Sequence, residues 1–73
     1  MMGLGIAKDK EEAVKLFERA HNAGIVNGTF FLGLAYLNGD GVKKNKEEGR
    51  ELILKASEQG SKKAKEYLEK YRI

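Results

Sequence analysis

Few side chains in this sequence suit catalysis or metal binding. His21 is the single histidine and there is no cysteine, so one chain can build neither a histidine-based catalytic relay nor a multi-histidine or thiolate metal site. Asn38, Asp40 and Asn45 carry oxygen ligands of the kind Ca²⁺ prefers, but their acidic spacing and the neighbouring glycines do not fit a calcium loop. We therefore expect His21 to be a surface residue near a helix end, and a protein that is not an enzyme and uses no cofactor or metal.

Two glycine pairs and two carboxylate pairs are the remaining chemical candidates. The segments 3–5 and 39–41 both read Gly-x-Gly, but neither follows a predicted strand, which a phosphate-cradling loop requires. Glu11-Glu12 and Glu47-Glu48 fall where helices are predicted to begin, and carboxylates there stabilise the helix dipole. We interpret both pairs as structural.

Composition predicts one small globular domain. The chain has 73 residues, of which 41% are hydrophobic and 34% charged, which leaves room for three or four short helices around one core. No apolar stretch is long enough for a membrane helix or a signal-peptide core. Because the absence of cysteine favours a reducing compartment, we expect a cytoplasmic protein that does not interact with membranes.

The sequence repeats itself after 36 residues, so that Gly5 meets Gly41. At this offset residues 3–37 overlay residues 39–73, and turn glycines, charged residues and apolar positions coincide. Periods of about 20 to 50 residues are typical of stacked structural repeats. We therefore predict a single domain over residues 1–73 in which two helix-turn-helix repeats stack as an α-solenoid fragment.

Each repeat is predicted to contain two helices joined by a turn. Asp9 and Asn45 suit the N-cap position, where a side-chain oxygen accepts a hydrogen bond from a free backbone N–H. Gly24 and Gly60 suit the left-handed C-terminal cap. Behind the N-caps, apolar stripes recur at helical spacing, comprising Ala13, Leu16, Phe17 and Ala20 in one repeat and Gly49, Leu52, Ile53 and Ala56 in the other. The pattern predicts an all-α fold of four helices, over about residues 10–23, 27–38, 46–59 and 62–72.

The two ends of the predicted stack differ. Helix 27–38 is apolar nearly all round, which predicts packing on both sides, whereas helix 62–72 has one charged face, as a terminal cap requires. At the other end the helix that would precede helix 10–23 is missing, which predicts an exposed apolar edge. Three interpretations of this edge remain open: a site for a partner helix, a site for a second copy of the chain, or a cut in a longer repeat array. We favour the second copy, which gives a homodimer. The residues of this edge are predicted to be Met1, Met2, Leu4 and Val14.

The repeat resembles a known family. The string Leu32-Gly33, Tyr36, Gly39 and Gly41-Val42, followed by a capped helix with Leu52 and Ala56 and then by Gly60 and Ala64, resembles the Sel1-like repeat, a relative of the tetratricopeptide repeat. The sequence departs from the family pattern at Gly28 and Gly49, where alanine is usual, and at Glu69 and Arg72, where glycine and tyrosine are usual. The last two departures fit a capping end. The resemblance implies a scaffold or adaptor in protein complexes, with no chemistry intrinsic to the fold.

The resemblance also implies a concave binding surface formed by helices 27–38 and 62–72. Matching Leu32, Gly33 and Tyr36 to the family pattern places six residues on this surface, namely Asn27, Phe30, Leu34, Lys63, Glu66 and Lys70. Phe30 is the expected anchor, because aromatic residues dominate interaction hot spots. In the alternative that the sequence leaves open, the N-terminal segment covers Phe30, Leu34 and Leu37.

A basic surface gives the alternative function. The whole net charge of +3 lies in residues 38–73, where Lys43, Lys44 and Lys46 form one cluster and Lys62, Lys63 and Lys65 another. Such clusters can contact phosphates, as in a small nucleic-acid-associated regulator. No aromatic residue for base stacking is interleaved with the lysines, so we favour a protein partner.

Overall fold

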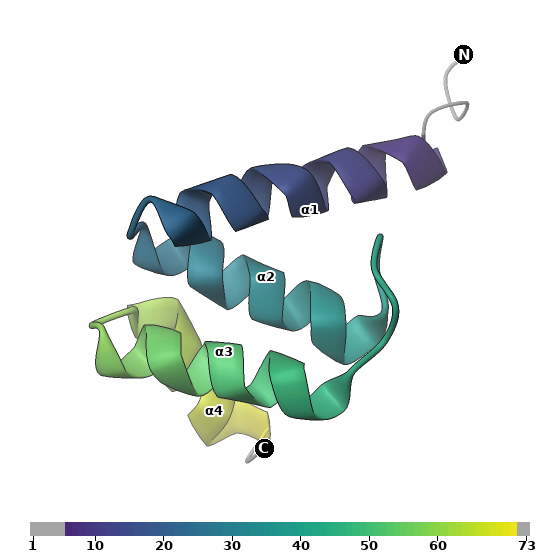
Figure 1. Cartoon of the computed structure of the whole chain (residues 1–73). Helices are drawn as coiled ribbons and strands as arrows, with labels where there is room; N and C mark the ends of the chain where they lie inside the picture. Colours follow the sequence, from purple (N-terminus) through teal and green to yellow (C-terminus); the bar gives the residue numbers. More distant parts are fainter. Residues whose placement is uncertain (1–5, 72–73) are drawn as a thin grey trace.

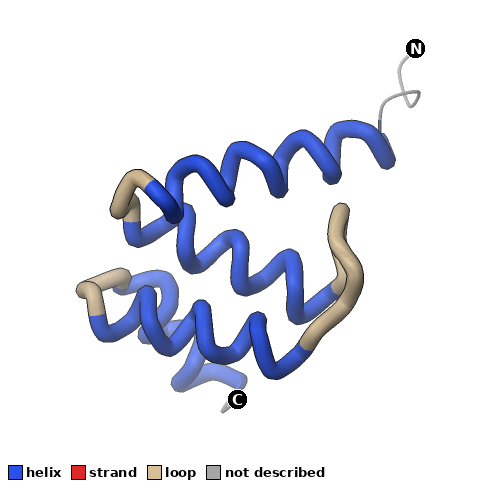
Figure 2. The backbone as a smooth tube through the Cα atoms, viewed as in Figure 1, coloured by secondary structure: helices blue, strands red, loops and turns tan. Residues whose placement is uncertain are grey.

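The computed structural model describes residues 6–71, and every regular element within that range is an α-helix. The helices are α1 (Ile6–Asn22), α2 (Val26–Asn38), α3 (Lys46–Glu58) and α4 (Lys62–Tyr71). They stack in chain order, with α4 behind α3 (Figure 1). Short turns join α1 to α2 and α3 to α4, and a longer loop, residues 39–45, joins the two pairs (Figure 2). The predicted all-α fold of four helices in two stacked hairpins is confirmed.

Helix α1 begins earlier than its sequence predicts. It starts at Ile6 and contains Asp9, so the prediction of Asp9 as N-cap is wrong. Residues 6–9 contain neither glycine nor proline, so nothing in them stops the helix from extending toward the N-terminus. The corresponding residues 42–45 of the second repeat belong to the loop before α3 instead.

Helix α2 lies at the centre of the molecule and contacts the three other helices. It contains no charged residue, so burial on several sides leaves no charge without a partner. Two apolar clusters include it, one of Val14, Leu32, Ala35 and Leu52 and the other of Phe30, Ile53, Ala56 and Ala64. The prediction that this helix is flanked on both sides is therefore confirmed.

Helices α2 and α3 touch through glycine. A methyl group on Gly33 would lie 2.8 Å from the carbonyl oxygen of Gly49, and one on Gly49 would lie 2.6 Å from that of Gly33. Both glycines are buried. Because any side chain at these positions would meet backbone, which cannot move aside as a side chain can, the pair sets the distance between α2 and α3.

The loop between α2 and α3 folds back onto α1. Gly41 has φ +80°, and a methyl group on it would overlap the backbone carbonyl of Lys10. Beside this contact, Nζ of Lys10 lies 3.6 Å from a carboxylate oxygen of Asp40. The loop covers Val14, which is 4% exposed. The prediction that Val14 lies on the exposed N-terminal edge is therefore wrong.

The α3 and α4 helices begin with different caps. Asn45 Oδ1 accepts a hydrogen bond from the Glu48 backbone N–H at 3.1 Å, which confirms the predicted cap of α3. Ser61 Oγ accepts one from the Ala64 N–H, also at 3.1 Å, and lies 3.4 Å from Asn27 Oδ1 on α2. Asn45 is exposed, whereas Ser61 is 2% exposed.

This difference predicts unequal costs for losing the two caps. We expect Asn45→Ala to lower the free energy of unfolding by about 1 kcal/mol and Ser61→Ala to lower it by about 2 kcal/mol. The larger value follows because Ser61→Ala leaves a buried N–H without a partner and also removes the contact with Asn27. Urea unfolding monitored by circular dichroism measures both; equal costs would contradict the role given to the contact with α2.

Candidate binding groove

A row of five aromatic rings crosses the molecule from α1 over α2 to α4. Their centroids are separated by 5.4 Å between Phe17 and Phe31, 5.2 Å between Phe31 and Phe30, 5.8 Å between Phe30 and Tyr67, and 4.5 Å between Tyr67 and Tyr71. Rings at such distances stabilise each other in addition to their burial. We call these five residues the aromatic row.

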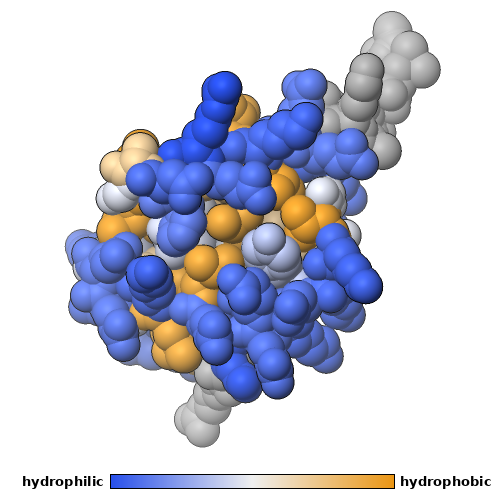
Figure 3. Space-filling model, in the orientation of Figure 1, coloured by the Kyte–Doolittle hydropathy of each residue, from blue (hydrophilic) through white to orange (hydrophobic). Residues whose placement is uncertain are grey.

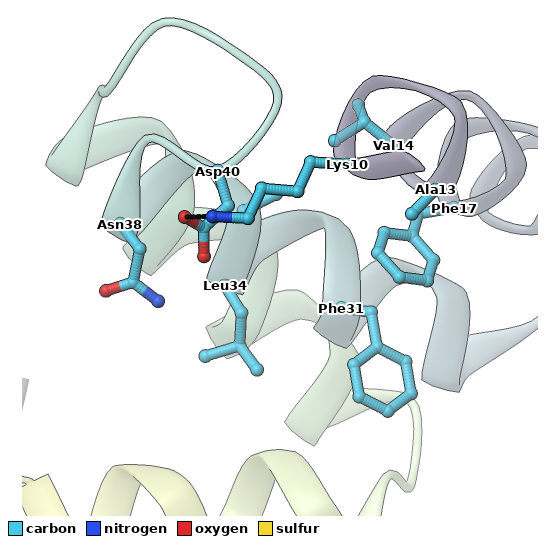
Figure 4. Close-up of a pocket in the computed structure, with 9 residues that line it drawn as sticks. Lys10, Ala13, Val14, Phe17, Phe31, Leu34, Asn38 and Asp40 are labelled. Carbon is cyan, nitrogen blue, oxygen red and sulfur yellow. Dashed lines mark ion pairs between the residues drawn. The ribbon is translucent and has the colours of Figure 1, made fainter. Parts of the chain in front are cut away.

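The first half of the row lines a hollow between α1 and α2 with a volume of about 250 Å³. Phe17, Phe31 and Leu34 form its apolar wall, and the ion pair between Lys10 and Asp40 closes one end (Figure 4). Both charged side chains are about half exposed. The ion pair therefore forms a polar rim beside an apolar floor.

The second half of the row lines a hollow between α2 and α4 with a volume of about 280 Å³. Tyr67 packs against Phe30 here and Tyr71 packs against Tyr67. The rim consists of three exposed charged residues, Lys63, Glu66 and Lys70. Phe31 lines both hollows. The two hollows therefore lie next to each other along the aromatic row, and we call them together the groove.

The structure gathers most of the predicted concave-surface residues along this groove. Phe30, Lys63, Glu66 and Lys70 share the second hollow, and Leu34 lies in the first. Asn27 lines neither, and its side chain contacts Ser61 instead.

Phe30 occupies a different position from the one expected of an anchor. It is 6% exposed because it packs against Ile53, Ala56 and Ala64, so it forms the floor of the groove rather than a projecting side chain. These covering residues belong to α3 and α4. The alternative of an N-terminal cover concerns residues 1–5, which lie outside the described residues.

Sequence reasoning missed Phe17, Phe31, Tyr67 and Tyr71 as groove residues. Their helical spacing assigned them to the core, and the first three are indeed half-buried. Tyr71 is 54% exposed, and Lys70 Nζ lies 5.5 Å from its ring centroid. One sequence signal was available, since Tyr67 and Tyr71 stand four residues apart next to the lysines of α4.

The predicted self-association edge is only partly within the described residues. Met1, Met2 and Leu4 lie outside the described range, and Val14 is buried as shown above. Leu16, which was assigned to the apolar stripe, is 59% exposed, whereas its repeat counterpart Leu52 is 8% exposed. On the side of the molecule seen in Figure 3, apolar surface forms a broken band between the polar outer sides of α1 and α3.

The two lysine clusters lie apart. Lys43, Lys44 and Lys46 are at the start of α3, whereas Lys62, Lys63 and Lys65 are at the start of α4, beyond the far end of α3. A 13-residue helix is about 20 Å long. The clusters therefore do not form one phosphate-binding patch.

His21 is not the surface residue that the sequence predicts. It is half-buried, and its Nδ1 lies 2.7 Å from Oγ1 of Thr29, a residue that is 2% exposed. The side chain links α1 to α2, and so has a structural role.

Among the side chains that the structure describes, those of residues 10–71, no group of three or more acidic or histidine residues is placed to hold a metal ion. None of the four helices is long and apolar enough to cross a membrane.

Comparison with protein families identifies the repeat. The family model described as Sel1 repeat matches residues 1–24 and 26–61. The chain belongs to the Sel1 repeat family. The second match spans 36 residues, equal to the internal offset of the sequence, and joins α2 to α3. No curated protein and no solved structure matched the chain.

Membership of the Sel1 family fits the geometry described above. Sel1 repeats form helical solenoids and generally mediate protein–protein interaction. In this Sel1 protein the unit matched by the family model contains the close contact between Gly33 and Gly49, so the contact lies within one Sel1 unit.

Proposed function

We propose that the protein is a non-catalytic interaction module that holds a segment of another protein in the groove along the aromatic row. The continuity of the row from α1 to α4 is the observation that carries this proposal. Aromatic side chains bury large areas at little conformational cost, which makes them the usual anchors of protein contacts. Tyr71, rather than Phe30, is the exposed ring that a partner reaches first.

The charges of the rim indicate the chemistry of the partner segment. Lys63 and Lys70 flank the second hollow with one glutamate, Glu66, between them, so the rim there carries an excess of positive charge. A segment with apolar side chains for the two hollows and an acidic residue near Tyr71 complements this arrangement. We further propose that the protein acts in the cytoplasm, which the lack of cysteine supports.

Peptide selection tests the groove. We expect the chain to select apolar, acidic sequences from a random peptide library. Tyr71→Ala is expected to weaken binding of the selected peptides at least about tenfold, because truncating an aromatic hot spot costs about 2 kcal/mol or more. The measurement is isothermal titration calorimetry with the full chain. Leu54→Ala is the matched control, since Leu54 is 42% exposed on α3 and lines neither hollow. Equal losses for both variants would contradict the groove proposal.

We also propose that the chain associates with a second copy of itself through α1 and so forms a homodimer. The exposed Leu16 is the observation behind this second proposal. It concerns a surface that does not include the aromatic row, so the two proposals stand separately.

A further inference from the structure

One face of α1 is shaped to receive a helix. Among the helices of residues 6–71, α1 packs against α2 alone. Leu16 of α1 is 59% exposed, whereas Leu52, at the same place in the second repeat, is 8% exposed. Leu52 belongs to a cluster with Leu32 and Ala35 of α2, so in the second repeat this place is covered by a helix.

The side chains around Leu16 follow the spacing that helix packing uses. Glu12, Lys15, Leu16 and Arg19 line a hollow of about 240 Å³. They stand at positions i, i+3, i+4 and i+7, the four residues that surround a side chain inserted from a facing helix in knobs-into-holes packing. The occupant of this hollow is therefore expected to be a helix.

Helix α4 of another copy does not fit this face. It corresponds to α2 in the repeat, but it carries Glu69 where α2 has Gly33, and Glu66 where α2 has Phe30. Both glutamates are exposed, and Glu69 cannot reproduce the backbone contact that Gly33 makes with α3. Copies of the chain are therefore not expected to stack head to tail into a fibre.

Helix α1 of a second copy does fit. We propose that two copies pair through antiparallel α1 helices about a two-fold axis between Lys15 and Leu16, with each Leu16 inserted into the partner's hole. This register is self-complementary, because Glu12 of each copy then faces Arg19 of the other copy, which gives two pairs of opposite charge. The stem of Lys15 covers the partner's Leu16 while its ammonium group stays in water. The inference rests on the self-association proposed above and is independent of the groove.

The expected dimer is weak and reversible. One pair of helices buries less than the roughly 1,200–2,000 Å² of a standard interface. We expect a dissociation constant between about 10 µM and 1 mM. Sedimentation equilibrium of the full chain up to about 2 mM covers this range; a protein that remains monomeric throughout it would overturn both the pairing and the self-association.

A leucine comparison locates the interface. Leu16→Arg is expected to raise the dissociation constant at least about thirtyfold, because it removes two buried leucines from the dimer and brings like charges together. Leu54→Arg changes an exposed leucine of α3 and is expected to leave the constant unchanged. Circular dichroism checks that both variants fold. Equal weakening by the two, or none by Leu16→Arg, overturns the proposal.

A charge exchange tests the antiparallel register. Glu12→Arg and Arg19→Glu are each expected to weaken dimerisation several-fold, since each replaces two attractive pairs by two repulsive ones. The double variant Glu12→Arg/Arg19→Glu restores the attraction and is expected to recover the constant of the unmodified chain within about twofold. If the double variant does not recover this dissociation constant, the antiparallel register is wrong, whereas self-association through α1 still stands.

Discussion

Replacing Gly33 by valine is expected to lower the free energy of unfolding by about 3 kcal/mol or more. The added side chain would meet the carbonyl oxygen of Gly49 and the side chains of Ile53 and Leu52, all of which a methyl group on Gly33 already approaches within 3.1 Å. A backbone oxygen cannot rotate away, so α2 and α3 must separate. Small domains are stable by only about 5 kcal/mol or a little more, so this loss removes most of the stability.

The control for Gly33→Val introduces valine at an exposed position instead of a buried one. Glu51→Val introduces valine at an exposed position of α3, and its expected cost is below about 1 kcal/mol, from helix propensity alone. Urea unfolding followed by circular dichroism gives both values. If the two variants lost similar stability, the distance between α2 and α3 would not depend on the contact between Gly33 and Gly49.

Replacing Gly41 by alanine is expected to cost about 3 kcal/mol, from two separate effects. Its φ of +80° costs a residue with a side chain about 1–2 kcal/mol. In addition, the new methyl group would overlap the Lys10 carbonyl and lie 3.0 Å from Val14 Cγ2, so the loop would have to lift from α1. Because Val14 is 4% exposed beneath this loop, lifting it also exposes part of the core.

Gly24→Ala separates the two effects. Gly24 has φ +86°, close to that of Gly41, but a methyl group there meets no atom within 4 Å. Its expected cost is therefore the backbone strain alone, about 1–2 kcal/mol. Thermal unfolding by calorimetry measures the difference between the two variants. A Gly41→Ala protein as stable as the Gly24→Ala protein would show that the loop contributes nothing through its contact with α1.

The helices were largely predictable because local signals coincide in this chain. The glycines after each first helix and the apolar stripes recur at the 36-residue offset, and Asn45 stands where the stripe of α3 begins, so propensity, capping and pattern agree. The exception is the start of α1. Asp9 is a residue type favoured at the N-cap. A helix begins at such a residue only if the residues before it disfavour helix, and residues 6–8 do not.

The candidate site was less predictable, because it depends on how far apart helices lie. The periodicity placed Phe30 and Leu34 on a face, but could not tell that α3 and α4 bury Phe30 while leaving Tyr71 exposed. Val14 shows the same limit, since the loop that covers it approaches from 27 residues away in the sequence. Contacts between distant segments leave no periodic signal in the sequence.

The position of α2 has a consequence for how the chain folds. Repeat arrays can gain structure one repeat at a time when each hairpin is stable by itself. Here α2 has no charged residue and needs α1, α3 and α4 to cover it, so neither hairpin can satisfy it alone. We therefore expect the four helices to form and melt as a single cooperative unit, with one transition that every spectroscopic probe reports at the same temperature.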